Sequence, residues 1–177
     1  KSLSLSEDID KDINVVYTPL NGTGMVFVPR VLNERGFTNI HIVKEQKDPD
    51  PDFTTVGYPN PEDVNAFKLS IELGREVNAD LLMATDPDCD RIAIMVKDKN
   101  NEYEAFNGNQ SGAILVKYIL EGMKNKNILP SNGVIVKSIV TGDLGKVIAE
   151  SYGVHTDEAL TGFKNICGKI NDYEKYG

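Results

Sequence analysis

The first hundred residues alternate between short apolar runs and longer stretches that place apolar side chains on one helical face. The runs expected to form strands are 13–17, 40–43, 81–84 and 92–96. Amphipathic spacing predicts a helix that follows the turn 18–24 and reaches about Arg35, and another from Pro61 to about Val77. Residues 102–106 follow a turn and are expected to pair back as a hairpin. This order indicates an α/β layer with a largely parallel sheet.

A second alternation of strands and helices occupies the rest of the chain. Residues 107–110 are expected to lead into a helix that reaches about Met123, and further helices are predicted at 143–152 and from Gly162 to about Tyr173. Residues 134–140 are expected to form a strand, and 154–158 a strand or an extended segment. We place a domain boundary near 104–107, which gives domains 1–104 and 105–177. The expected fold class is therefore two consecutive α/β domains, each with a mainly parallel mixed sheet flanked by helices. A second domain this short buries a modest fraction of its surface, so we expect the chain to be part of a longer protein.

Composition narrows the possible functions. The 177-residue chain carries a net charge of −8, which argues against a nucleic-acid-binding surface. No apolar run approaches the roughly 18 residues needed to cross a bilayer, and no secretory leader is apparent in residues 1–12. Cys89 and Cys167 form no C-x-x-C motif, and we expect both to be reduced. These features predict a cytoplasmic protein without membrane or nucleic-acid partners.

An acidic loop, Thr85–Arg91, carries the most specific chemistry in the chain. Its carboxylates, Asp86, Asp88 and Asp90, alternate along the backbone, so their oxygens can point at one position. Three anions at one position repel one another unless a cation lies between them. Carboxylate oxygens are ligands for hard divalent cations, Mg²⁺ above all. In open α/β sheets, ligands bind just past the carboxyl ends of the strands. Because the loop follows a predicted strand, we predict a Mg²⁺ site here.

Three other interpretations of this loop are possible. An EF-hand calcium loop also begins D-x-D-x-D, but it needs Gly at its sixth position and Glu at its twelfth. Those positions hold Arg91 and Lys97, which excludes an EF-hand. A solvated acidic turn without a ligand is the plainest alternative, and the flanking strands argue against it. A phosphatase with an aspartate nucleophile has its D-x-D loop after the first strand, whereas this loop follows several elements.

Two glycine patterns fall short of nucleotide-binding motifs. Gly22 and Gly24 follow a predicted strand, but a dinucleotide fingerprint needs a third glycine where Phe27 stands, which leaves a tight turn into a helix. Gly162–Lys169 lacks the spacing and the Ser or Thr of a P-loop. For Thr161–Lys164, a capped helix start with a surface lysine is the simplest interpretation. Backbone N–H groups that receive a phosphate or sugar hydroxyl are the alternative.

Six segments of the chain occur together in one known family. They are Tyr17–Gly24, Pro59–Glu62, Asn78–Leu81, Thr85–Arg91, Gly108–Gly112 and Ala159–Lys164. In this order they resemble the α-D-phosphohexomutases, the phosphoglucomutase/phosphomannomutase family, over nearly the whole chain. The acidic loop resembles the family's metal-binding loop, and the last segment resembles its sugar-contacting loop. The resemblance is closest to the phosphoglucomutases with broad hexose specificity.

The resemblance implies a four-domain enzyme, of which this chain is the second domain and most of the third. That enzyme interconverts hexose 1-phosphates and hexose 6-phosphates through a phosphoserine and a bound intermediate, glucose 1,6-bisphosphate for glucose. The phosphoserine domain and the phosphate-binding fourth domain are outside this chain, so the chain alone is expected to be inactive. Those two domains and a hexose phosphate substrate are the expected partners.

The resemblance also implies roles for individual residues. The implied site residues are Asp86, Asp88 and Asp90 for Mg²⁺, Arg91 for catalysis, and Thr161, Gly162 and Lys164 for the substrate. Arg91 would place a fixed positive charge beside the transferred phosphoryl group, and Lys164 would contact sugar or phosphate. Phe163 stands where some relatives have His or Trp, so the preferred hexose does not follow. A non-catalytic module that binds a divalent metal or a sugar phosphate is the alternative function.

Overall fold

The computed structural model describes residues 4–6 and 9–176, and it divides them into two compact units. The first unit comprises residues 9–108, and the second comprises 109–176 together with 4–6. The unit boundary falls between Gly108 and Asn109, a few residues after the boundary expected at 104/105. In the described residues, no helix is long and apolar enough to cross a membrane.

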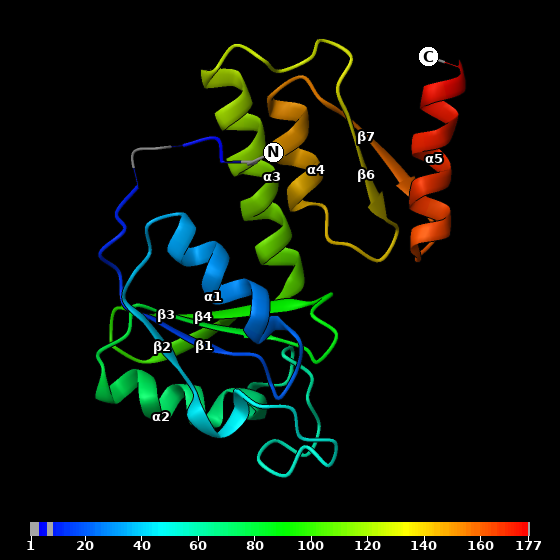
Figure 1. Cartoon of the computed structure of the whole chain (residues 1–177). Coiled ribbons are helices and arrows are strands. Elements are labelled where there is room, and N and C mark those ends of the chain that lie inside the picture. Colours follow the sequence, from blue (N-terminus) through cyan, green and yellow to red (C-terminus); the bar gives the residue numbers. More distant parts are fainter. Residues whose placement is uncertain (1–3, 7–8, 177) are drawn as a thin grey trace. The chain divides into compact units, whose positions relative to one another are not determined.

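The first unit is built on one five-stranded mixed sheet (Figure 1). Its strands, in sheet order, are β2 (Ile40–Ile42), β1 (Val15–Thr18), β3 (Leu81–Thr85), β4 (Ile92–Lys97) and β5 (Tyr103–Phe106). Strand β1 pairs in parallel with β2 and β3, and β4 runs antiparallel to β3 and β5. The predicted strands and hairpin are therefore present, and the expected mixed α/β architecture is confirmed. The acidic loop joins β3 to β4 at the end of the sheet where the parallel strands β1, β2 and β3 have their carboxyl ends.

Helices α1 (Gly24–Glu34) and α2 (Lys68–Glu76) cover opposite faces of this sheet (Figure 1). Short 3₁₀ turns occur at η1 (Lys44–Gln46) and η2 (Val64–Phe67). The core between sheet and helices includes Val16, Leu20, Phe67, Leu82 and Met95. Val16, Leu82 and Met95 lie on strands that the apolar pattern identifies, whereas Leu20 lies in the turn after β1 and Phe67 in η2. Burial of these apolar side chains holds the layers together.

The start of α2 differs from the prediction. The helix expected from Pro61 begins as a 3₁₀ turn at Val64, because the Asp63 carboxylate accepts a hydrogen bond from the Asn65 N–H and caps the turn there. Pro61 is buried before the helix instead of standing in its first turn. The acidic residues before the cap therefore belong to a loop.

The second unit holds a two-stranded parallel sheet, β6 (Val134–Ser138) and β7 (His155–Ala159). Its helices are α3 (Gly108–Asn125), α4 (Leu144–Ser151) and α5 (Phe163–Tyr176). Helices α4 and α5 lie on opposite sides of the sheet (Figure 1). A small core gathers around Leu120, Ala149 and Val154. Because the strands are parallel, their carboxyl ends and the loops that follow them share one edge.

Candidate functional site

The acidic loop is a tight connection between two paired strands. Thr85 at the end of β3 pairs with Ile92 at the start of β4, so only residues 86–91 make the turn. The Cys89 N–H donates to the Asp86 carbonyl at 3.0 Å, and Cys89 takes a positive φ of 62°. This curl brings one oxygen each of Asp86, Asp88 and Asp90 within 4.8 Å of one another. The alternation read from the sequence therefore does place the three carboxylates around one position.

Arg91 holds the first carboxylate in place from within the same loop. Its backbone N–H donates to Asp86 Oδ1 at 2.9 Å, and its Nε donates to Oδ2 at 2.7 Å. The Asp86 side chain is 2% exposed, whereas 47% of the Arg91 side chain is exposed. Burial raises the pKa of Asp86, but the hydrogen bonds from Arg91 outweigh it and bring the pKa below its usual value. Asp86 is therefore a fixed, ionised carboxylate, and each of its oxygens keeps a second lone pair.

The outer carboxylates are exposed and crowded. A hydrogen bond shared with Asp86 and the negative charge of Asp88 raise the pKa of Asp90 above its usual value. The Arg91 Nε lies 3.8 Å from Asp90 and offsets this repulsion only in part. An oxygen-only donor set with surplus negative charge and two exposed members fits a hard divalent cation that keeps several water ligands. These three residues therefore fit Mg²⁺.

Two glycines bring the turn after β1 against this loop. A Cβ on Gly22 would overlap the backbone of Pro87, and a Cβ on Gly24 would overlap the Tyr17 hydroxyl. The Tyr17 hydroxyl and Thr85 Oγ1 form a buried 2.8 Å hydrogen bond directly beneath the loop. Gly22 and Gly24 are therefore required because the turn packs closely on the acidic loop. The sequence analysis explained the two glycines only by a tight turn into a helix.

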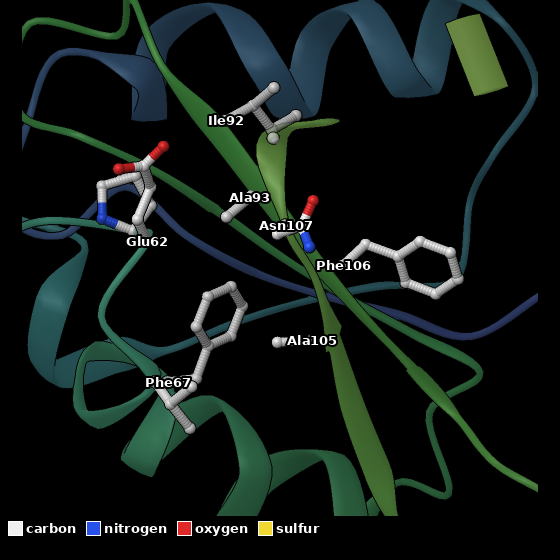
Figure 2. A pocket seen from close by; sticks show the side chains of 10 residues that line it. Glu62, Phe67, Ile92, Ala93, Ala105, Phe106 and Asn107 are labelled. Carbon is white, nitrogen blue, oxygen red and sulfur yellow. The ribbon is translucent and has the colours of Figure 1, made fainter. Parts of the chain in front are cut away.

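A residue that the sequence did not single out, Asn60, extends the network. Its Oδ1 accepts a hydrogen bond from Arg91 Nη1 at 3.1 Å. A pocket of about 400 Å³ begins beside it, with Glu62, Phe67 and Ile92 among the lining residues (Figure 2). None of its 10 lining residues is basic, and most are apolar. The pocket therefore lacks the cations that a phosphate group would need.

The predicted substrate residues lie in the second unit, where Thr161 and Gly162 join β7 to α5 and Lys164 belongs to the first turn of α5. Thr161, Gly162 and Lys164 are all exposed. Gly162 has a φ of 114°, which an L side chain rarely adopts, so the turn into α5 depends on glycine. The Asn165 side chain donates to the Thr161 carbonyl at 3.0 Å and steadies this turn. The three residues are thus accessible side by side, in the connection and the helix start that follow the carboxyl end of β7.

Two residues at the end of β6 support that turn and escaped the sequence analysis. The Ser138 hydroxyl lies 2.9 Å from Thr161 Oγ1. The Lys137 side chain is only 10% exposed, and its Nζ lies 3.2 Å from both Asp143 and Glu158. Burial alone would lower the pKa of Lys137, but hydrogen bonds to both carboxylates raise it above its usual value. The available signal in the sequence was a lysine inside the apolar run 134–140.

Comparison with known families accounts for both parts of the chain. Residues 2–100 match phosphoglucomutase/phosphomannomutase, alpha/beta/alpha domain II, and residues 107–176 match alpha/beta/alpha domain III. The chain belongs to the phosphoglucomutase/phosphomannomutase family. The family expected from the resemblance is thereby confirmed. The acidic loop lies in the part that matches domain II, and the Thr161–Lys164 turn lies in the part that matches domain III.

Individual members of this family match the chain over most of its length. The phosphoglucomutase of Staphylococcus haemolyticus is 40% identical over 163 residues, which are 92% of this chain and 29% of that protein. The chain thus spans under a third of the length of this curated relative.

Solved structures of phosphohexomutases share the fold. A phosphoglucomutase/phosphomannomutase family protein from Burkholderia thailandensis superposes with a TM-score of 0.71 at 16% identity, covering 91% of this chain and 32% of its own. The N-acetylphosphoglucosamine mutase of Aspergillus fumigatus, solved with GlcNAc-6P and magnesium, gives 0.60 at 17% identity, covering 89% and 33%. A variant of the latter was solved with glucose 1,6-bisphosphate. At these identities the structures show the fold alone.

Proposed function

We propose that this chain is the metal-binding and sugar-contacting part of a Mg²⁺-dependent phosphohexomutase, a cytoplasmic isomerase of carbohydrate metabolism. The parent enzyme interconverts hexose 1-phosphates and hexose 6-phosphates through an enzyme phosphoserine and a hexose 1,6-bisphosphate. The observation that carries the proposal is the convergence of Asp86, Asp88 and Asp90 within 4.8 Å, in the part of the chain that matches family domain II. The magnesium and glucose 1,6-bisphosphate of the Aspergillus fumigatus structures support the same chemistry.

The acidic loop would hold Mg²⁺ through one oxygen from each of its three aspartates. Bound there, Mg²⁺ would act as a Lewis acid on the phosphoryl group of the phosphoserine, which comes from outside this chain. Asp86 sets the position of the site, because burial and the two Arg91 hydrogen bonds fix its carboxylate. Asp88 and Asp90 are both exposed, so a phosphoryl group from outside the chain could reach a cation held between them.

Arg91 has two tasks in this proposal. Its backbone N–H and Nε position Asp86, and the exposed part of its guanidinium places a fixed positive charge beside the site. Phosphoryl transfer depends mainly on positioning and on neutralising charge that is spread over the phosphoryl oxygens. An arginine held in one orientation by Asp86 and Asn60 supplies such a charge without having to reorganise during the reaction.

The turn between β7 and α5 would contact the sugar. Thr161 offers a hydroxyl held by Ser138, Gly162 offers exposed backbone, and Lys164 offers a cation for sugar oxygens or phosphate. Lys137 would support this surface without contacting the sugar, because its ion pairs to Asp143 and Glu158 connect the loop after β6 to the end of β7. The sugar would then meet a prearranged surface.

The proposal is tested by a coupled assay of glucose 1-phosphate conversion to glucose 6-phosphate. The assay uses the full-length parent and the 177-residue chain separately, each with Mg²⁺ and a trace of glucose 1,6-bisphosphate. We expect activity in the parent, its loss on chelation of Mg²⁺, and none in the chain alone, because the phosphoserine lies elsewhere. A parent that converts no hexose 1-phosphate would contradict the mutase and leave the non-catalytic binding module. Activity of the chain alone would show that the nucleophile is misassigned.

A further inference from the structure

Thr23 stands at the N-cap of α1 but does not cap the helix. An N-cap threonine ordinarily accepts a hydrogen bond from an N–H of the first turn, which stabilises the helix. Here the Thr23 side chain makes no such bond. Its Oγ1 donates instead to the carbonyl oxygen of Pro87, at 3.1 Å, 64 residues further along the chain. The Thr23 hydroxyl therefore makes a contact with the acidic loop in place of the helix cap that its position favours.

The same carbonyl receives a second hydrogen bond from Thr23. The Thr23 backbone N–H donates to the Pro87 oxygen at 2.8 Å, so one residue occupies both lone pairs of that oxygen. Pro87 stands between Asp86 and Asp88, and its carbonyl belongs to the peptide that leads into Asp88. Fixing that peptide fixes the direction in which the second carboxylate leaves the backbone.

The turn that presents Thr23 is itself held in an unusual conformation. Leu20 and Asn21 both have positive φ, 46° and 61°, which is uncommon for residues other than glycine. The Asn21 N–H donates to the Gln46 carbonyl at 2.8 Å, and Gly22 allows the backbone to approach Pro87. Strained backbone persists where the surroundings over-determine it. These contacts bring Thr23 to the loop and hold it there.

We propose that Thr23 is a positioning residue for the metal site, acting through the Pro87 carbonyl to hold Asp86 and Asp88 at the separation that a divalent cation requires. This inference rests on the proposed function, because it presumes that the acidic loop binds Mg²⁺. Residues that orient metal ligands typically change metal affinity by about 10- to 100-fold when they are replaced. Thr23 keeps its backbone hydrogen bond in any variant, so the effect of its side chain falls at the lower end of that range.

The test compares Thr23→Val, which removes the hydroxyl at nearly constant shape, with Thr23→Ser, which restores it. Thr38→Val is the matched control, because Thr38 is exposed and precedes β2. It therefore lies at the amino ends of the parallel strands, whereas the acidic loop lies at their carboxyl ends. The first measurement is Mg²⁺ affinity by titration calorimetry on the 177-residue chain. We expect about 10-fold weaker binding for Thr23→Val, and wild-type affinity for Thr23→Ser and Thr38→Val. Equal affinity in all four proteins would overturn the positioning role.

A second measurement does not depend on metal binding. Cys89 is partly buried, and its Sγ packs against Gly24 beside Thr23. In a Cys167→Ser background, the alkylation rate of Cys89 without metal reports how often the loop leaves that turn. We expect a several-fold faster rate in Thr23→Val alone, and an unchanged rate would count against the proposal. If the wild type binds no Mg²⁺ although the alkylation rates differ as expected, the proposed metal site fails and the positioning of the loop stands.

Discussion

Replacing Asp88 by Asn in the full-length parent is expected to abolish mutase activity without unfolding the protein. Asp88 is exposed, and its charge adds to the repulsion that raises the pKa of Asp90, after the hydrogen bond that Asp90 shares with Asp86. Removing that charge therefore does not destabilise the metal-free loop. It does remove one of three anionic ligands, and Lewis-acid stabilisation of the phosphoryl group is worth several kcal/mol. A loss of activity on the order of a thousand-fold follows.

The measurement is kcat for hexose phosphate conversion, with Mg²⁺ affinity and the thermal midpoint recorded on the same samples. Asp52→Asn is the matched control, because Asp52 is also exposed and lies in the same unit but outside the acidic loop. The control should keep wild-type values for all three quantities. Asp88→Asn with wild-type activity would remove Asp88 from the metal site, and a variant that fails to fold would show that the carboxylate is structural.

Gly22→Ala is expected to damage both the fold and the metal site. The added methyl group would overlap backbone atoms of Pro87, and backbone cannot rotate away as a flexible side chain can. Forcing extra volume into a packed contact typically lowers the free energy of unfolding by about 1–3 kcal/mol. Because relief of the overlap must displace Pro87 and with it the acidic loop, Mg²⁺ affinity should fall along with stability.

Chemical denaturation and Mg²⁺ titration of the same variant measure the two effects. Gly168→Ala adds the same methyl group within α5, where it meets nothing within 4 Å. That control should be neutral or more stable by up to about 1 kcal/mol, since alanine favours a helix over glycine. A Gly22→Ala variant with unchanged stability and affinity would mean that the turn and the acidic loop are not packed together as described.

The features that the sequence predicted are those encoded by short-range patterns. Apolar runs marked β1, β3 and β4 because buried strands must be apolar, and the spacing of Asp86, Asp88 and Asp90 predicted their convergence. The length of β6 was overestimated because Ile139 and Val140 continue an apolar run, although the chain turns there through a hydrogen bond from Thr141 to Ser138.

The features that the sequence did not reveal depend on contacts between distant residues. Nothing near Thr23 indicates that its hydroxyl bonds to Pro87 and not to its own helix. The burial of Lys137 depends on Asp143 and Glu158, which come together only when β6 and β7 pair. Asn60 looks like an ordinary polar loop residue in the sequence, and its role follows only from the hydrogen bond that Arg91 donates to it. The positions of these supporting residues depend on tertiary structure, whereas the three aspartates proposed as ligands form a compact motif.

Anomalous diffraction from crystals of the full-length parent grown with Mn²⁺ in place of Mg²⁺ tests the metal site most directly. Mn²⁺ prefers the same oxygen ligands, and its anomalous signal identifies the ion without reference to activity. We predict a peak within about 2.5 Å of one oxygen from each of Asp86, Asp88 and Asp90. A peak elsewhere, or none at saturating Mn²⁺, would contradict the assignment of the acidic loop as the metal site.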